Sequence, residues 1–219
     1  MPRAIDKKKQ TSREAILSAA EAAFAERGFS GARVDDIAES SGFNKTLIFR
    51  HFGDKLGLYS EVLKRVDEAI GSLQGRNFAP LLQTENLASN PRKFRLLLKA
   101  IAETTFDYMV EHPRTLKILN WEAAEGWRTF ARIVTQFPTD ELKRMEDVFR
   151  HAWRAGLLRS DFHPLIQISL VSKICLSYLA SVPLYHLLVS EEDLGDEKSL
   201  THAKRFVVDA IVHGLVRQD

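Results

Sequence analysis

Residues 12–62 carry the most informative pattern in the chain and read SREAILSAAEAAFAERGFSGARVDDIAESSGFNKTLIFRHFGDKLGLYSEV. From Ile16 to Phe24 its apolar residues recur at spacings of three and four, which is typical of a helix with one buried face. The capping pattern TSRE at residues 11–14 predicts the start of this helix, and Gly28 predicts its end.

Two short helices are expected directly after it. The first covers Val34–Ser41 and ends at Gly42, and Asn44 then offers a cap for a second helix over Lys45–His51. A helix this short buries too little surface to be stable alone. Two short helices joined by a tight turn and braced by a third form the helix-turn-helix layout.

Residues 12–62 resemble the TetR-type DNA-binding domain along their whole length. The markers are an Ala-Ala-x-x-x-Phe helix ending in Glu-Arg-Gly-Phe at residues 26–29, Asp-Ile-Ala at 36–38, Gly42 in the turn, and Arg-His-Phe at 50–52 followed by Lys55. The resemblance implies a DNA-binding domain at residues 10–70, with its motif at about 33–52. In this family the third helix enters the major groove, where side chains meet base edges.

Carried over position by position, the resemblance implies that DNA contacts come from the third helix and its flanks. Lys45 and Arg50 are expected either to read guanine or to anchor a phosphate, and both roles stay open. His51 is expected to contact phosphate, or instead to pack against the connector helix. The full set of expected DNA-contact residues is Arg33, Asn44, Lys45, Thr46, Leu47, Phe49, Arg50, His51 and Lys55.

The chain departs from the family pattern at three places. Phe49 stands where the family usually has Tyr, and Leu47 and Ala32 each replace a common Thr. Each change removes a positioning hydrogen bond rather than a base reader, so we expect affinity to depend more on Lys45, Lys55 and a basic N-terminal arm. The fold is unaffected, because a small apolar core is still expected from Phe24, Ile37, Ile48 and Phe52.

The remainder of the chain also reads as helical, which predicts an all-α protein. A connector helix runs from about Asp54 to Ile70, and a Gly- and Pro-containing stretch leads to Asn90. Residues 71–219 are expected to form a helical effector-binding and dimerisation domain. Its helices are predicted at about Pro91–Glu111, Pro113–Glu125, Gly126–Phe137, Thr139–Ala155, Pro164–Val189 and Gly195–Arg217.

The last two helices are more apolar than a single exposed face requires. In the family the corresponding helices pair with those of a second subunit as a four-helix bundle, which implies a homodimer reading a pseudo-palindromic operator. The apolar residues that fit this role are Leu165, Ile168, Leu170, Val171, Ile174, Leu176, Leu179, Phe206, Val207, Ala210, Ile211 and Leu215.

Aromatic residues in the middle of the chain are candidates for an effector pocket. Ligand cavities mix aromatic walls with a few polar groups, although aromatic stripes at helical spacing also form plain core. The candidates are Phe106, Tyr108, Trp121, Trp127, Phe130 and Trp153. Such a wall favours an unidentified small hydrophobic or aromatic effector.

The composition is that of an ordinary globular protein of 219 residues, 45% hydrophobic and 27% charged. Residues 1–65 hold 12 Lys and Arg against 9 Asp and Glu, whereas the rest holds 19 against 20. The excess at Arg3 and Lys7–Lys9 suits a flexible arm on phosphate or a merely solvated tail. Because polar residues interrupt the apolar run 164–189, we expect no membrane span and a cytoplasmic location.

No catalytic residue, metal site or cofactor is expected. Cys175 lies in an apolar helix without a neighbouring base, and the His residues lack metal-ligand spacing. The leading hypothesis is a transcriptional repressor that an effector releases from its operator, and a transcriptional activator is the alternative within the same class. Two other classes stay open: an architectural protein that binds DNA without a ligand, and a small-molecule or lipid carrier with a vestigial DNA-binding head.

Overall fold

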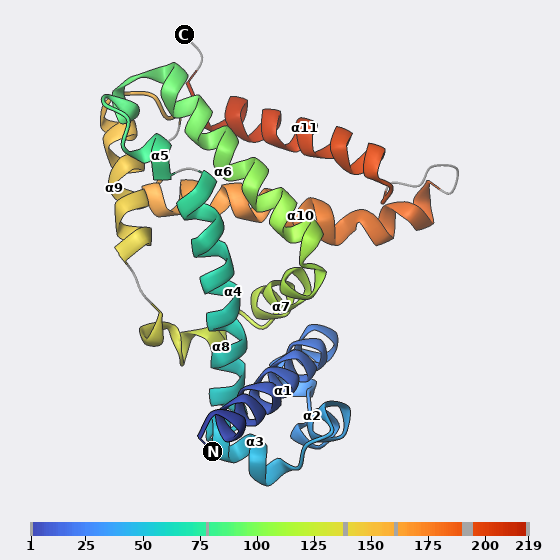
Figure 1. Cartoon of the computed structure of the whole chain (residues 1–219). Coiled ribbons are helices and arrows are strands. Elements are labelled where there is room, and N and C mark those ends of the chain that lie inside the picture. The colour runs from blue at the N-terminus through green and yellow to red at the C-terminus, as the bar shows by residue number, and fades with distance from the viewer. Residues whose placement is uncertain (1, 78, 138–139, 160–161, 190–194, 218–219) are drawn as a thin grey trace. The chain divides into compact units, whose positions relative to one another are not determined.

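The computed structural model describes residues 2–77, 79–137, 140–159, 162–189 and 195–217 (Figure 1). Over these residues the regular structure is helical, apart from a single bridge between Leu158 and Val216, so the predicted all-α class is confirmed. The helices, in chain order, are α1 (Pro2–Gly31), α2 (Val34–Ser41), α3 (Lys45–Phe52), α4 (Lys55–Asn77), α5 (Ala79–Leu82), η1 (Leu87–Ser89), α6 (Pro91–Glu111), α7 (Pro113–Ala124), α8 (Arg128–Ala131), η2 (Val134–Gln136), α9 (Asp140–Arg154), α10 (Pro164–Leu188) and α11 (Glu197–Leu215).

The chain forms two compact units. The first comprises Met1–Ala69 and Pro113–Phe137, and the second comprises Ile70–His112 and Pro138–Asp219. The chain thus leaves the first unit within α4, near the predicted boundary at residue 70. It returns for residues 113–137, which were expected to belong with the C-terminal helices and which pack instead with α1 and α4.

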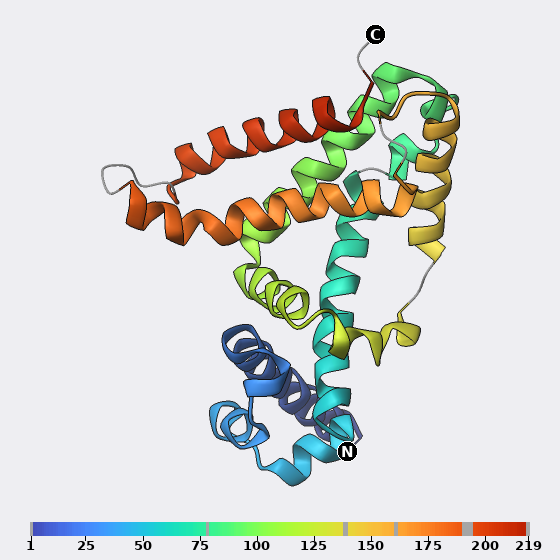
Figure 2. The same cartoon turned by 180° about the vertical axis from the view of Figure 1, so that it is seen from behind.

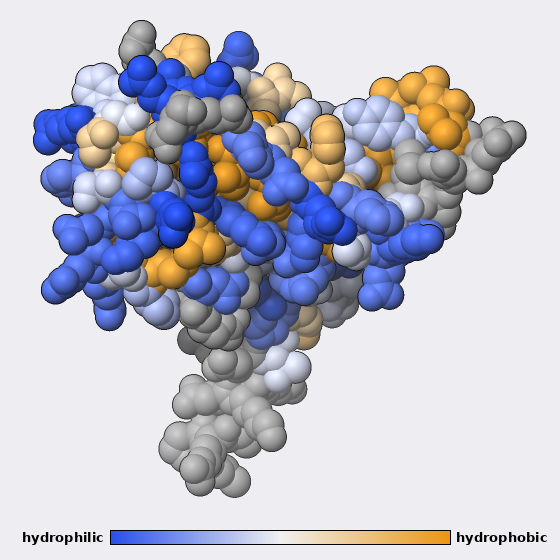
Figure 3. Space-filling model, turned by 90° about the horizontal axis from the view of Figure 1, so that it is seen from above, coloured by the Kyte–Doolittle hydropathy of each residue, from blue (hydrophilic) through white to orange (hydrophobic). Residues whose placement is uncertain are grey.

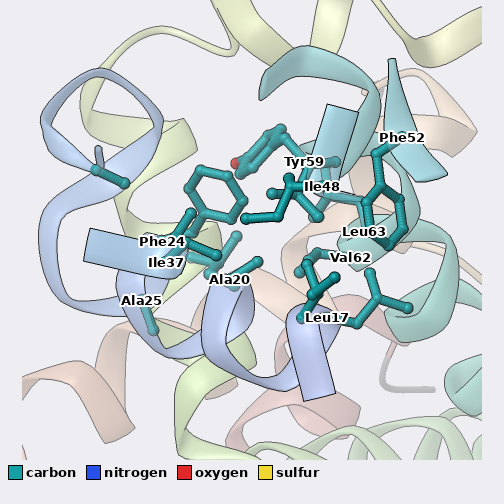
Figure 4. Close-up of a cluster of buried hydrophobic side chains, with 14 of the residues drawn as sticks. Leu17, Ala20, Phe24, Ala25, Ile37, Ile48, Phe52, Tyr59, Val62 and Leu63 are labelled. Carbon is teal, nitrogen blue, oxygen red and sulfur yellow. The ribbon is translucent and has the colours of Figure 1, made fainter. Parts of the chain in front are cut away.

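The first unit is built on a continuous apolar cluster drawn in Figure 4. Phe24, Ile37, Ile48 and Phe52 are all buried, which confirms the predicted core. The Tyr59 ring of α4 meets the Phe24 ring edge-on at a centroid distance of 4.8 Å. Helices α2 and α3 each contribute only one or two large side chains, so they are held in place by the longer α1 and α4.

The first helix is longer than predicted. It starts at Pro2 and continues through the predicted start at residues 11–14, because nothing between Pro2 and Thr11 interrupts a helix. The expected flexible arm is therefore helical over residues 2–10; the side chains of Arg3 and Lys7–Lys9 lie outside the described residues. Gly28 does break the helix, with φ +65° and ψ 179°.

The predicted single helix over residues 126–137 is wrong. The structure has two short pieces there, α8 and η2. Trp127 takes a left-handed φ of +60° and its N–H donates to the carbonyl oxygen of Glu122 at 2.7 Å, which closes a turn after α7. The run Ile133-Val134-Thr135 is β-branched, and such residues disfavour a continuous helix.

In the second unit, α6 lies beside both α10 and α11, as both cartoon views show (Figures 1 and 2). Its core includes Phe94 and Phe149, whose rings meet edge-on at 5.4 Å, and the fully buried Cys175. An ion pair of 2.9 Å between Lys204 and Asp107 joins α11 to α6. These elements match the predicted helices to within a few residues.

Helix α10 is long and apolar enough to cross a membrane by length and composition, contrary to the sequence expectation. Its polar residues are mostly serines, which lower the mean hydropathy only to 1.6. One helix of this kind is a weak indication, since core helices of other proteins meet the same criterion. Only 22% of the most apolar window of α10 is buried within the chain. The surface seen in Figure 3 carries hydrophobic patches among hydrophilic residues.

Candidate nucleic-acid interface

A tight turn joins α2 to α3. Gly42 ends α2 with a φ of +75°, a left-handed conformation that favours glycine, and the Phe43 N–H donates to the Ala38 carbonyl oxygen at 3.1 Å. Asn44 then starts α3, because its side-chain oxygen accepts a hydrogen bond from the Leu47 N–H at 2.9 Å. The predicted helix-turn-helix layout and its cap are therefore present.

Helix α3 has an inner and an outer face. Ile48 and Phe52, one helical turn apart, are buried in the core of the first unit. Lys45, Thr46, Phe49 and Arg50 are exposed on the outer face, and the Phe49 side chain is unusually open for a large apolar residue, at 43%. The helix thus presents cationic, hydroxyl and aromatic groups together.

The cations around this face differ in how they are held. The Lys45 ammonium lies 2.5 Å from an Asp35 carboxylate oxygen. Arg33 precedes α2 and is exposed, as is Arg50; neither guanidinium has an ion-pair partner among the residues that the structure describes. Both can therefore turn toward an external anion without breaking an existing ion pair.

His51 and Lys55 are held more firmly within the unit. The His51 ring nitrogen Nε2 lies 3.4 Å from the Ser12 hydroxyl of α1. The Lys55 ammonium donates to the Ser30 carbonyl oxygen at 3.4 Å and lies over the Phe29 ring. Burial lowers the pKa of Lys55, partly offset by Glu125. These contacts indicate that both side chains help to hold α3 and the start of α4 against α1.

Two further predicted positions are partly used by the fold. The Asn44 side-chain oxygen is occupied by the cap, which leaves its amide N–H groups for a partner. Leu47 is half-buried and packs against the core cluster. Ala32, where the family has Thr, is buried at 2% exposure.

A buried polar contact ties residues 113–137 to α4. The Tyr59 hydroxyl donates to a Glu122 carboxyl oxygen at 2.6 Å, and the other oxygen accepts from the Phe130 N–H at 3.1 Å. Glu122 is 2% exposed. Burial, and then the hydrogen bond to Glu122, raise the pKa of Tyr59 well above its ordinary value. This pair was not predicted from the sequence, where its only signal was a glutamate in an otherwise apolar stretch.

The structure divides the six candidate effector residues between the units. Trp121, Trp127 and Phe130 belong to the first unit, where the Trp127 and Phe130 rings meet edge-on at 6.1 Å. Trp121 packs against Gly28, where an added Cβ would lie 3.0 Å from its ring.

The other three candidates belong to the second unit. Phe106 and Tyr108 are buried, and the Phe106 ring lies 6.2 Å from that of Tyr178. Trp153 is 43% exposed. Neither unit gathers all six candidates.

The described residues contain no group of three or more His, Cys, Asp or Glu that could hold a metal ion. The Cys175 thiol is fully buried, and burial raises its pKa to about 12. A thiol with such a pKa is a poor nucleophile at neutral pH.

Comparisons with known proteins agree along most of the chain. The family model described as "Bacterial regulatory proteins, tetR family" matches residues 16–62, and that described as "Tetracyclin repressor-like, C-terminal domain" matches residues 96–211. The transcriptional repressor NicS of Pseudomonas putida is 23% identical over 209 residues, covering 94% of this chain and 92% of NicS. The transcriptional activator FasR of Mycolicibacterium smegmatis is 35% identical over 98 residues, covering 44% of this chain and 39% of FasR.

Among solved structures, the ketosteroid transcriptional regulator KstR2 of Mycobacterium tuberculosis shares the fold. Its TM-score is 0.59 at 20% identity, and the match covers 94% of this chain and 95% of KstR2. The two family models together span both the helix-turn-helix and the C-terminal helices. The chain therefore belongs to the TetR family of bacterial regulatory proteins and is a DNA-binding transcriptional regulator.

Proposed function

We propose that this regulator is a cytoplasmic repressor that binds a pseudo-palindromic operator as a homodimer and is released by a small hydrophobic or aromatic effector. The observation that carries the DNA-binding part is the outer face of α3, where Lys45, Thr46, Phe49 and Arg50 are exposed on a helix whose other face is locked into the core. A rigid helix with such a face fits the major groove.

The side chains divide into base readers and phosphate anchors. Arg50 and Lys45 have the donors that guanine O6 and N7 accept, and the open Phe49 ring suits contact with a thymine methyl group. Arg33 lies at the start of α2, where side chains and helix N–H groups commonly meet phosphate. His51 and Lys55 hold the helix in place, and the Lys55 ammonium adds positive charge near the DNA backbone.

Dimerisation is supported by α10 and α11. Of the predicted bundle residues, Val171, Leu179, Val207 and Ile211 are buried within the protomer, so they belong to its own core. Apolar surface nevertheless remains on both helices: Ile166, Ile174, Leu184, Leu187, Leu188 and Phe206 are exposed. Exposed apolar side chains gathered on two helices favour packing against the same helix pair of a second subunit. A two-fold dimer of this kind would place two helix-turn-helix domains on one operator.

The effector and the direction of regulation rest on the relatives. KstR2 is named a ketosteroid regulator, which agrees with the hydrophobic effector suggested by the aromatic candidates. NicS is named a repressor, whereas FasR is named an activator and matches over a shorter part of this chain. We therefore favour repression and keep activation as the second candidate.

The residue roles are tested by fluorescence anisotropy with an operator selected from random duplexes. Lys45→Ala and Arg50→Ala should each weaken operator binding by about 1–3 kcal/mol, or about 5- to 150-fold, wherever the side chain reads a base. Arg92→Ala removes an exposed arginine at the start of α6 and serves as the control, with no change expected. Unchanged affinity in both α3 variants would contradict the assignment of the outer face of α3 to base reading.

The effector part has its own test. A panel of hydrophobic and aromatic compounds is added to the preformed protein–operator complex, and release is followed by anisotropy. Release by a compound that also raises the melting temperature of the free protein supports the proposal. A carrier with a vestigial head would bind such compounds without an operator, and an architectural protein would bind DNA with no effect of any compound.

A further inference from the structure

One ion pair on the outer face of α3 is not part of the family resemblance. Asp35, in the first turn of α2, has a carboxylate oxygen 2.5 Å from the ammonium of Lys45, in the first turn of α3. The pair joins the two helices of the motif across the turn at Gly42. Both side chains are about half exposed, at 56% for Asp35 and 48% for Lys45.

The neighbouring acid behaves differently. Asp36 pairs with Arg27 of α1 and so ties α2 to the frame of the unit. Asp35 instead faces the residue expected to touch DNA. A carboxylate at this place interacts favourably with the start of α2. It also repels DNA phosphate, which opposes binding at this face.

We propose that Asp35 is a specificity-determining residue. It positions Lys45 and neutralises its ammonium charge, which weakens the attraction of Lys45 to the phosphates of non-specific DNA. The inference rests on the proposed function, in which α3 reads the operator. An ammonium group has several N–H donors, so Lys45 can keep its bond to Asp35 while the remaining donors reach a base edge. A lysine without Asp35 would swing freely and attach to any phosphate in reach.

The physical consequence concerns the ratio of specific to non-specific binding. Non-specific affinity comes almost entirely from phosphate contacts, and each contact adds about 0.9 to the slope of log K against log salt concentration. Pairing Lys45 with Asp35 removes about one such contact from binding to random DNA. Pairing with Asp35 reduces affinity less where Lys45 contacts a base. The paired side chain is already ordered, so less conformational entropy is lost when it binds.

The test compares Asp35→Asn with Glu39→Gln in the full-length protein. Glu39 is an exposed acid on the same short helix, so both variants change the net charge equally. Binding to a random-sequence duplex is measured between about 50 and 200 mM salt. We expect Asp35→Asn to steepen the salt slope by about 0.9 more than Glu39→Gln does, and to raise affinity for the random duplex by about 2- to 5-fold.

A double variant isolates the role of Lys45. In a Lys45→Ala background, Asp35→Asn should change the salt slope only as much as Glu39→Gln does, because Lys45 makes the additional phosphate contact in the single variant. The ratio of operator to random-duplex affinity should fall in Asp35→Asn and stay unchanged in Glu39→Gln. A purely structural role for Asp35 would move the melting temperature and leave the salt slope as in the control.

Two results would overturn the inference: equal slopes for Asp35→Asn and Glu39→Gln, or an Asp35→Asn effect of full size in the Lys45→Ala background. The random-duplex titration needs no operator, so these outcomes are separate from failure of the proposed function. Failure of the proposed function would appear instead as the absence of any preferred DNA sequence. In that case there would be no sequence specificity for Asp35 to determine.

Discussion

Tyr59→Phe is the substitution whose effect follows most directly from the structure. It removes one hydroxyl from a fully buried ring and leaves a Glu122 oxygen, in a side chain only 2% exposed, without the donor that lies 2.6 Å away. The ring itself keeps its place against Phe24. A buried hydrogen bond to a charged group contributes about 1.5–3 kcal/mol, so the free energy of unfolding should fall by about that amount.

The assay is a urea titration of the full-length protein in a Trp153→Phe background, so that the fluorescence reports Trp121 and Trp127, which belong to the same unit as Tyr59 and Glu122. Glu122→Leu alone should also destabilise the protein, since it strands the Tyr59 hydroxyl. The double variant Tyr59→Phe/Glu122→Leu should cost less than the two single changes together by about 1.5–3 kcal/mol. Strict additivity would show that the Tyr59 hydroxyl and the Glu122 carboxyl group do not interact, contrary to this prediction.

The same pair gives a prediction for alkaline pH. The pKa of Tyr59 is raised from 10.0 in the folded protein, chiefly by burial. Its contribution to stability is therefore fully present below about pH 10 and is lost as pH rises further toward the folded pKa, because only the unfolded chain releases the proton. The stability difference between wild type and Tyr59→Phe should shrink above pH 10. A difference that stays constant to about pH 11 would contradict this.

Two further substitutions and one labelling experiment test separate parts of the structure. Gly57→Ala should destabilise the first unit by about 1–3 kcal/mol in urea titrations, because the added Cβ would lie 2.0 Å from the Phe52 carbonyl oxygen; unchanged stability would mean that the backbone yields freely. Asn44→Ala should cost about 1 kcal/mol of stability by loss of the α3 cap, and a variant as stable as wild type would argue against the cap. Cys175 should resist a thiol reagent at about pH 8 in the native protein and react once urea unfolds it, since burial raises its pKa to about 12; rapid native labelling would contradict its burial.

Local patterns were sufficient for the helix-turn-helix. Helix spacing, Gly42 at the end of the first short helix and the Asn44 cap predicted α2 and α3. The four core residues Phe24, Ile37, Ile48 and Phe52 are all buried. The predictions depended on periodicity and turn chemistry, which act over a few residues.

Contacts between distant residues were not predictable in this way. Tyr59 and Glu122 are far apart in the sequence, and nothing local indicates that they meet, so the return of residues 113–137 to the first unit was missed. The Lys45–Asp35 pair was missed because exposed charges carry no periodic signal. The start of α1 was misplaced because a capping pattern inside a longer helix reads the same as a true start.

We propose above that the outer face of α3 reads a particular DNA sequence in a two-fold arrangement. The measurement that tests it most directly is selection of the purified protein against a randomised duplex pool at about 150 mM salt, which suppresses binding to phosphate alone. We expect enrichment of a pseudo-palindrome, lost in Arg50→Ala and retained in Arg92→Ala. Recovery of unselected sequence by the wild-type protein would contradict the claim.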